Sequence, residues 1–201
     1  EYRLDALRSL LRIRCTEHDW EAAIESARRL EKEASEDHSA DIAHFHCELA
    51  ELAVKQKNPE AAEREVSLAL LEKPYSPRAL MLAGDFAFQK NQVKEAVEDW
   101  EKLRQHSEDH FPLVFSRLVK GYDALGDAAG AQAVIDYALN RFPTSEVVEQ
   151  AMKRAFKDKG QQAAAEIVSK GLSGHPTLGT LSVAMEFRKM IRKRQISWLL
   201  I

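Results

Sequence analysis

Apolar side chains recur at intervals of three and four residues along most of the chain, with polar residues between them. This spacing places the apolar residues on one face of an α-helix, where they can pack against a neighbouring helix. Polar turn sequences interrupt the pattern repeatedly. The pattern therefore predicts an all-α protein of short amphipathic helices joined by tight turns.

One theme recurs at a nearly constant period, and an alanine marks the same position in each copy. A polar turn precedes the alanine, and an apolar residue follows four positions later. Ala62, Ala96, Ala131 and Ala164 are 34, 35 and 33 residues apart, and Ala23 marks an earlier copy 39 residues before Ala62. We expect these small residues where two helices approach most closely, because a larger side chain there overpacks at a cost of roughly 1–3 kcal/mol.

The upstream half of the repeat has its own apolar pattern, seen in LMLAGDFA (80–87) and FSRLVKGY (115–122). Together the two halves resemble the tetratricopeptide repeat, a helix–turn–helix unit of about 34 residues. The resemblance predicts a right-handed α-solenoid of about five repeats and a C-terminal capping helix. The predicted repeats span about 4–38, 41–75, 77–110, 112–144 and 145–176, and residues 177–201 contain the capping helix (about 178–194) and a tail that fits neither pattern.

Short polar residues mark several predicted helix starts. Asp19, Asn58, Ser76 and Asp127 each stand just before a predicted helix, where such side chains accept hydrogen bonds from free backbone N–H groups. A proline follows both Asn58 and Ser76, as expected for the first turn of a helix.

Composition and charge exclude several classes of protein. The net charge of −3 at pH 7 gives no reason to expect nucleic acid as a partner. Two cysteines, Cys15 and Cys47, are too few for a disulfide framework, so we expect free thiols in a reducing compartment. No apolar run approaches the roughly 20 residues of a membrane helix. Because the chain starts on Glu1 within a helical pattern, we interpret it as part of a longer protein.

The segment AHFHCELA (43–50) contains the densest set of candidate metal ligands. In the register of the repeat, His46 takes the bulky core position, while His44 and Cys47 lie on the other face. A metal site there needs a ligand from elsewhere, such as Cys15; the alternative is an ordinary packed helix. No spacing typical of a nucleophile, a triad or a phosphate-binding loop occurs, so we predict no catalytic, cofactor-binding or metal-binding residue in this chain.

Two charged segments have simple interpretations. HSEDH (106–110) falls at the end of the third predicted repeat, where a solvated linker is expected. RKMIRKR (188–194) is interpreted as a solvated helix end, with weak binding to acidic lipid or nucleic acid as the alternative.

Stacked repeats leave a concave face lined by the first helix of each pair. The mixed charge of its predicted lining argues against a clamp for a terminal carboxylate. It favours a helix or extended protein segment held by apolar anchors and flanking charges. The residues predicted to contact this partner are Arg8, Arg12, His44, Cys47, Glu48, Glu51, Arg78, Met81, Asp85, Phe88, Arg117, Lys120, Glu149 and Lys153.

Three segments resemble the lipopolysaccharide assembly protein B family of Gram-negative bacteria. They are LLRIRCTEHDWEAAIESARRLEK (10–32), IAHFHCELA (42–50) and SGHPTLGTL (173–181), and the resemblance extends over most of residues 1–187. Members of that family have an N-terminal membrane helix, a cytoplasmic tetratricopeptide array and a C-terminal rubredoxin-like module that holds a metal through two CxxC pairs. This chain contains no CxxC motif, so the resemblance predicts a metal only in a module outside it.

The resemblance implies a non-catalytic adaptor at the cytoplasmic face of the inner membrane. Its expected partners are a membrane-bound ATP-dependent protease and a protein client, the deacetylase that commits precursors to lipid A. Membrane contact would come only through the N-terminal helix of the longer protein, and a homodimer is possible. The alternative is a tetratricopeptide protein-binding module of another bacterial assembly, secretion or chaperone complex.

Overall fold

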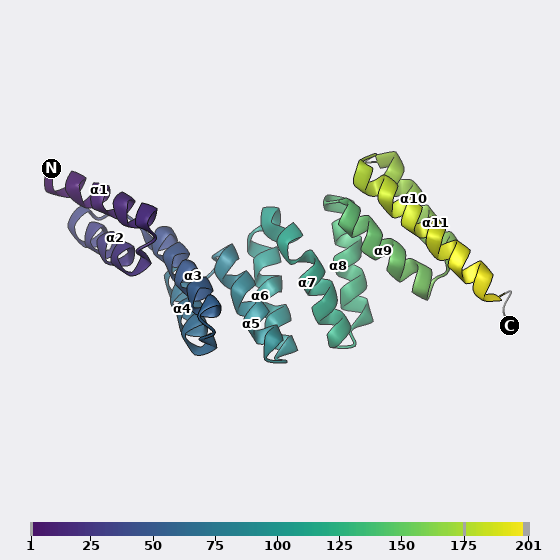
Figure 1. Cartoon of the computed structure of the whole chain (residues 1–201), viewed down its shortest axis with the longest axis horizontal. Helices are drawn as coiled ribbons and strands as arrows, with labels where there is room; N and C mark the ends of the chain where they lie inside the picture. The colour runs from purple at the N-terminus through teal and green to yellow at the C-terminus, as the bar shows by residue number, and fades with distance from the viewer. Residues whose placement is uncertain (1, 175, 199–201) are drawn as a thin grey trace. The chain divides into compact units, whose positions relative to one another are not determined.

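The computed structural model describes residues 2–174 and 176–198, and every regular element within these residues is a helix (Figure 1). The helices follow one another as pairs, and α11 comes after the fifth pair. The predicted all-α fold class is confirmed. The bounds are α1 Tyr2–Glu17, α2 Trp20–Ala34, α3 Ser39–Lys55, α4 Pro59–Glu72, α5 Pro77–Gln89, α6 Val93–His106, the 3-10 helix η1 Glu108–His110, α7 Phe111–Ala124, α8 Ala128–Arg141, α9 Ser145–Asp158, α10 Gln161–Gly174 and α11 Leu178–Trp198.

The helices form two compact units, one that ends at Gly121 and one that begins at Tyr122. In the first unit, α1 packs on α2, α3 on α4, and α5 on α6. Helix α3 also contacts α5, so the first helices of these successive pairs lie side by side. Two apolar clusters hold the pairs together: Ala23, Ala27, Ile42 and Phe45 in one, and Ala43, Cys47, Ala69 and Ala79 in the other.

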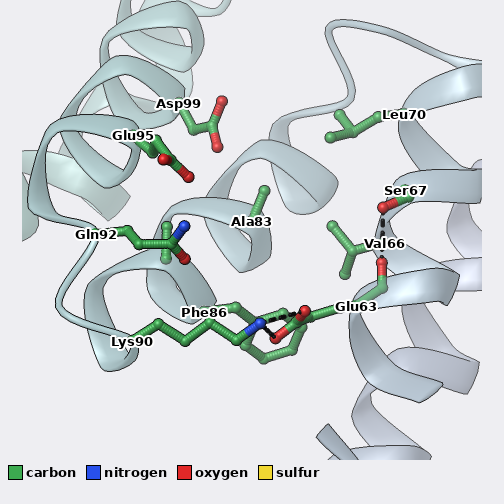
Figure 2. A pocket seen from close by; sticks show the side chains of 11 residues that line it. Glu63, Val66, Ser67, Leu70, Ala83, Phe86, Lys90, Gln92, Glu95 and Asp99 are labelled. Atoms are coloured by element: carbon green, nitrogen blue, oxygen red, sulfur yellow. Dashed lines mark hydrogen bonds and ion pairs between the residues drawn. The ribbon is translucent and has the colours of Figure 1, made fainter. Parts of the chain in front are cut away.

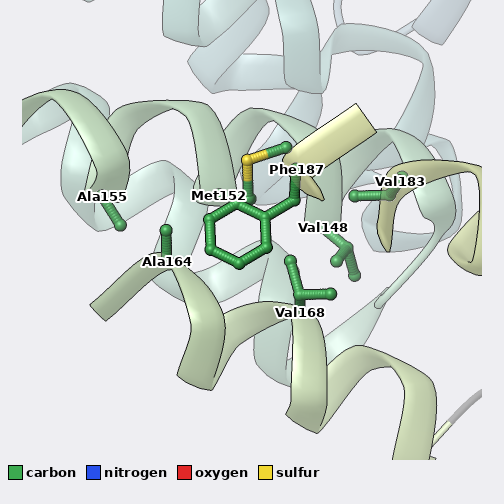
Figure 3. Close-up of a cluster of buried hydrophobic side chains, with 7 residues drawn as sticks. All are labelled: Val148, Met152, Ala155, Ala164, Val168, Val183 and Phe187. Carbon is green, nitrogen blue, oxygen red and sulfur yellow. The ribbon is translucent and has the colours of Figure 1, made fainter. Parts of the chain in front are cut away.

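In the second unit, α11 covers the apolar faces of α9 and α10, both of which it contacts. Figure 3 shows the ring of Phe187 on α11 lying among Met152, Ala164 and Val168. Val183, one turn earlier on α11, belongs to the same buried cluster. Burial of this stripe explains why α11 forms as a helix, since amphipathic helices gain most of their stability from packing.

The alanines that marked the repeat are core residues. Ala23, Ala96, Ala131 and Ala164 are 0% exposed, and Ala62 is 1% exposed. The side chain is small at each of these positions because the neighbouring helix lies close to it.

The turn inside each repeat has the same backbone geometry. His18, Lys57, Asn91, Gly126 and Gly160 all have positive φ angles, of 58°, 57°, 63°, 72° and 89°. In the turns after α1, α3, α5 and α7, the next backbone N–H donates to the carbonyl five residues earlier, which closes the first helix. Only two of these five residues are glycine, although glycine adopts this conformation at the lowest cost.

Three of the four predicted capping side chains bond as expected. Asp19, Asn58 and Asp127 each accept a hydrogen bond from the backbone N–H three residues later. Ser76 stands at the N-cap of α5, but in the described structure its side chain makes no capping hydrogen bond. Thr144 caps α9 in the same way as the three confirmed residues and was not predicted.

The last helix continues to Trp198, beyond the predicted end near residue 194. Residues 199–201 of the predicted tail, and residue 175 in the SGHPTLGTL segment, lie outside the described residues.

Candidate functional site: the first-helix face

The residues predicted to bind a partner lie on α1, α3, α5, α7 and α9, the first helices of the pairs. We use the term first-helix face for those of the predicted side chains on these helices that are exposed or half-buried in the structure. Within each unit, many of these side chains contact other charged side chains of the same unit. Several are joined to the next first helix by an ion pair.

Arg78 on α5 is the centre of the largest such group. Its Nη1 lies 2.5 Å from Oε1 of Glu48 and its Nη2 lies 2.7 Å from Oε1 of Glu51, both on α3. Nη1 also lies 3.1 Å from Nδ1 of His44. Although burial opposes the charge, the hydrogen bonds that Arg78 donates to Glu51 and Glu48 raise its pKa. The structure therefore brings four predicted residues into one contact group.

A second link joins α5 to α7. Arg117 Nε lies 2.6 Å from Oδ1 of Asp85 and its Nη2 lies 2.9 Å from Oδ2, which is a bidentate pair. Nζ of Lys120 lies 5.0 Å from the centre of the Phe88 ring, within the range of a cation–π contact. Arg117 therefore connects two repeats, whereas Lys120 is an exposed cation with an aromatic neighbour.

Cys47 does not lie on the first-helix face. It is 0% exposed and packs with Ala43, Ala69 and Ala79, with Leu82 nearby. The prediction that Cys47 contacts a partner is wrong, because the following first helix, α5, covers the side that a single repeat would leave open. Burial is the main cause that raises the pKa of the Cys47 thiol to about 11.

At the start of the chain, Arg8 and Arg12 are both exposed but differ in their contacts. Arg8 Nη1 lies 2.8 Å from Oδ1 of Asp5, and Arg8 also pairs with Glu36 in the segment between α2 and α3. Arg12 makes no ion pair with any side chain that the structure describes. Of the two, Arg12 is the cation available to a partner.

In the second unit, the predicted residues Glu149 and Lys153 pair with each other along α9, 2.5 Å apart. Arg154, which was not predicted, reaches from α9 to Oδ1 of Asp123 on α7 at 2.8 Å. This contact has the same form as the Arg78 and Arg117 links. The acidic residue lies on one first helix and the arginine on the next, about one repeat later in the sequence.

The histidines of AHFHCELA serve packing and ion pairing. His46 is 9% exposed, and its Nδ1 lies 2.7 Å from Oε2 of Glu65 on α4. His44 is exposed and contacts Arg78. Within the described residues, no three His, Cys, Asp or Glu side chains are placed to share a metal ion.

The first-helix face thus carries many charges but few free ones. Arg78 already pairs with two carboxylates and Arg117 with one. Neither arginine is therefore free to bind a terminal carboxylate of a partner. Met81 and Phe88 on α5 are half-buried and supply apolar surface between the paired charges. This arrangement suits a partner held by apolar contacts, with Lys120 and Arg12 as the available cations.

None of the helices in the described residues is long and apolar enough to cross a membrane.

The sequence is similar to curated bacterial proteins over most of its length. It is 23% identical to lipopolysaccharide assembly protein B of Escherichia coli (strain K12) over 187 residues, which are 93% of this chain and 48% of the relative. It is 24% identical to lipopolysaccharide assembly protein B of Haemophilus influenzae over 169 residues, 83% of this chain and 41% of the relative. The predicted resemblance is confirmed, and the chain spans about half the length of these relatives or less. No protein-family model matches the chain.

Solved structures show the same fold at low sequence identity. The structure of pilF from Pseudomonas aeruginosa matches with a TM-score of 0.58 at 19% identity, covering 96% of this chain and 86% of that one. PilW, described as a type IV pilus biogenesis factor, matches with a TM-score of 0.55 at 15% identity, covering 98% and 90%. A MamA structure gives 0.55 at 12% identity, covering 85% and 90%. These likenesses establish the tetratricopeptide-type helical fold.

Proposed function

We propose that this chain is a non-catalytic protein-binding scaffold that acts in the regulation of lipopolysaccharide synthesis. The observation that carries the proposal is the similarity to lipopolysaccharide assembly protein B over 93% of the chain. The helical repeats add a physical reason, because stacked helix pairs present extended surfaces for proteins.

In the finer form of the proposal, the first-helix face holds the deacetylase that commits precursors to lipid A. The longer protein then presents this client to a membrane-bound ATP-dependent protease at the cytoplasmic face of the inner membrane. Recognition rests on the apolar surface of Met81 and Phe88 and on the cation of Lys120. The arginines of α5 and α7 on this face, Arg78 and Arg117, are already paired with carboxylates of this chain.

The test is a binding titration of the purified 201-residue chain with the purified deacetylase at physiological salt. We expect saturable binding that Lys120→Glu weakens at least fivefold. Lys120 is exposed and its described contact is the Phe88 ring, so the variant should stay folded. Lys94→Glu is the matched control, since Lys94 is an exposed lysine on the second helix α6.

Absence of binding by a folded chain would reject this client for these repeats. Equal weakening by Lys120→Glu and Lys94→Glu would reject the first-helix face as the contact surface. A retained affinity in both variants, with binding still present, would also place the contact elsewhere on the chain.

A further inference from the structure

A trough runs between the second helices α4 and α6, on the side of α5 that does not carry the first-helix face (Figure 2). Its volume is about 270 Å³. The floor is apolar and contains two alanines of α5, Ala83 and Ala87, with Val66 and Leu70 of α4 on one side. This space accepts side chains rather than a whole helix, whose diameter is about 10–12 Å.

The rim of the trough is acidic. Glu63, Glu95 and Asp99 line it together with a single cation, Lys90, which lies 2.6 Å from Glu63. Lys102 pairs with Asp99 at 2.8 Å. Glu95 on α6 is exposed and has no ion-pair partner among the described side chains. The trough therefore combines an apolar floor with a carboxylate available to a partner's cation.

A pocket at the equivalent position in the second unit does not have the excess of carboxylates over cations that lines the trough. It lies between α8, α9 and α10 and holds about 420 Å³. Its carboxylates Asp136, Asp158 and Glu166 are matched by three cations, Arg154, Lys159 and Lys170. The repeat architecture creates both hollows, but the first has the acidic excess.

Helix α11 carries a surface of the complementary kind. Its buried stripe includes Val183 and Phe187, whereas Leu178, Leu181 and Met185 are 85%, 51% and 62% exposed. These three residues are spaced by three and four and lie on the face opposite the buried stripe. The same face continues with the exposed cations Arg188, Lys189 and Arg192, of which only Lys189 has an ion-pair partner, Glu186, among the described side chains.

We propose that the trough of one copy binds helix α11 of a second copy. The exposed leucine and methionine side chains of α11 enter the trough and contact its apolar floor, and Arg188 or Arg192 pairs with Glu95 on the rim. Contiguous exposed apolar patches on soluble proteins often mark interaction sites, and a helix can be recognised through anchor side chains spaced by three and four that enter a hydrophobic groove. Opposite charges on the two surfaces set the orientation of the contact.

The test is sedimentation velocity of the 201-residue chain over a range of concentrations at low salt. We expect a sedimentation coefficient that rises with concentration and an association that Glu95→Lys weakens at least tenfold. The double variant Arg188→Glu with Arg192→Glu should weaken it by a similar factor. Glu98→Lys is the matched control, because Glu98 is an exposed acid on the same helix that does not line the trough.

A mixing experiment separates a direct contact from an effect on folding. The Glu95→Lys chain has an unchanged α11, and the chain with glutamate at 188 and 192 has an unchanged trough. Mixed together, they should associate as the unmodified chain does, although each alone does not. Failure of the mixture to associate overturns the proposal. A chain that stays monomeric, or an association that Glu95→Lys leaves unchanged, overturns it as well.

Discussion

Gly84 on α5 lies against the indole of Trp100 on α6, and this contact leads to a sharp prediction. A Cβ atom at residue 84 would lie 2.3 Å from Nε1, 2.6 Å from Cδ1 and 2.8 Å from Cε2 of Trp100. Trp100 is 2% exposed, so the ring has no open space into which it can move. Gly84→Ala therefore forces α5 and α6 apart or drives the indole out of its rotamer.

The size of the effect follows from two opposing contributions. Overpacking in a core costs roughly 1–3 kcal/mol, and the short distances to three ring atoms favour the upper end. Alanine is favoured over glycine inside a helix by about 1 kcal/mol. We therefore expect Gly84→Ala to lower the free energy of unfolding by about 2 kcal/mol, a large fraction of the stability of a typical domain.

The assay is urea denaturation followed by circular dichroism, applied to Gly84→Ala, Trp100→Phe and the double variant. Phenylalanine presents a smaller ring to the added methyl group, so in that background Gly84→Ala should lower the free energy of unfolding by less than it does opposite Trp100. Trp100→Phe by itself should lower the free energy of unfolding less than most truncations of a buried aromatic side chain do. It removes an Nε1 that has no hydrogen-bond partner in the described part of the chain.

Gly174→Ala is the control, since a Cβ there meets no atom within 4 Å. It should change stability little. The reasoning fails if Gly84→Ala stabilises the unmodified protein, or if it destabilises both tryptophan and phenylalanine backgrounds equally.

Three further predictions follow from single residues. Lys57→Gly should raise the free energy of unfolding by about 1 kcal/mol, measured by urea denaturation, because φ is 57° there and glycine adopts that angle without strain; an unchanged midpoint would contradict this. Arg117→Glu should lower the melting temperature at low salt and less so at high salt, whereas Arg117→Met should show the smaller effect at both. With a thiol-specific chromogenic reagent, the half-buried Cys15 should react in the folded protein. Cys47 should react only on unfolding, because it is buried and its pKa is raised to about 11. Equal reaction rates of the two thiols in the folded protein would show that Cys47 is accessible.

The alanine positions were predictable because they depend on one repeat alone. Within a helix pair, residues three and four apart share a face, so the sequence identifies both the buried stripe and the small residue at the closest approach. Ala131 is 0% exposed for this reason. The same local logic located the capping side chains of Asp19, Asn58 and Asp127.

The contacts between repeats were not predictable in this way. Cys47 occupies a position that would face outward in an isolated helix pair, yet α5 of the next repeat covers it. The turn geometry at Lys57 was also missed, because lysine rarely adopts a positive φ. In both cases the neighbouring structure overrides what the residue prefers locally.

The ion pairs between first helices limit how this face can recognise a protein. A partner carboxylate that reaches Arg78 must replace Glu48 or Glu51, and the displaced carboxylate then loses its own pair. The exchange yields little net electrostatic energy, since partly exposed ion pairs are each worth about 0.2–1 kcal/mol. Affinity on this face must therefore come mainly from apolar surface such as Met81 and Phe88. The paired charges fix the spacing of the helices that present that surface, so they shape the site without being its principal binding groups.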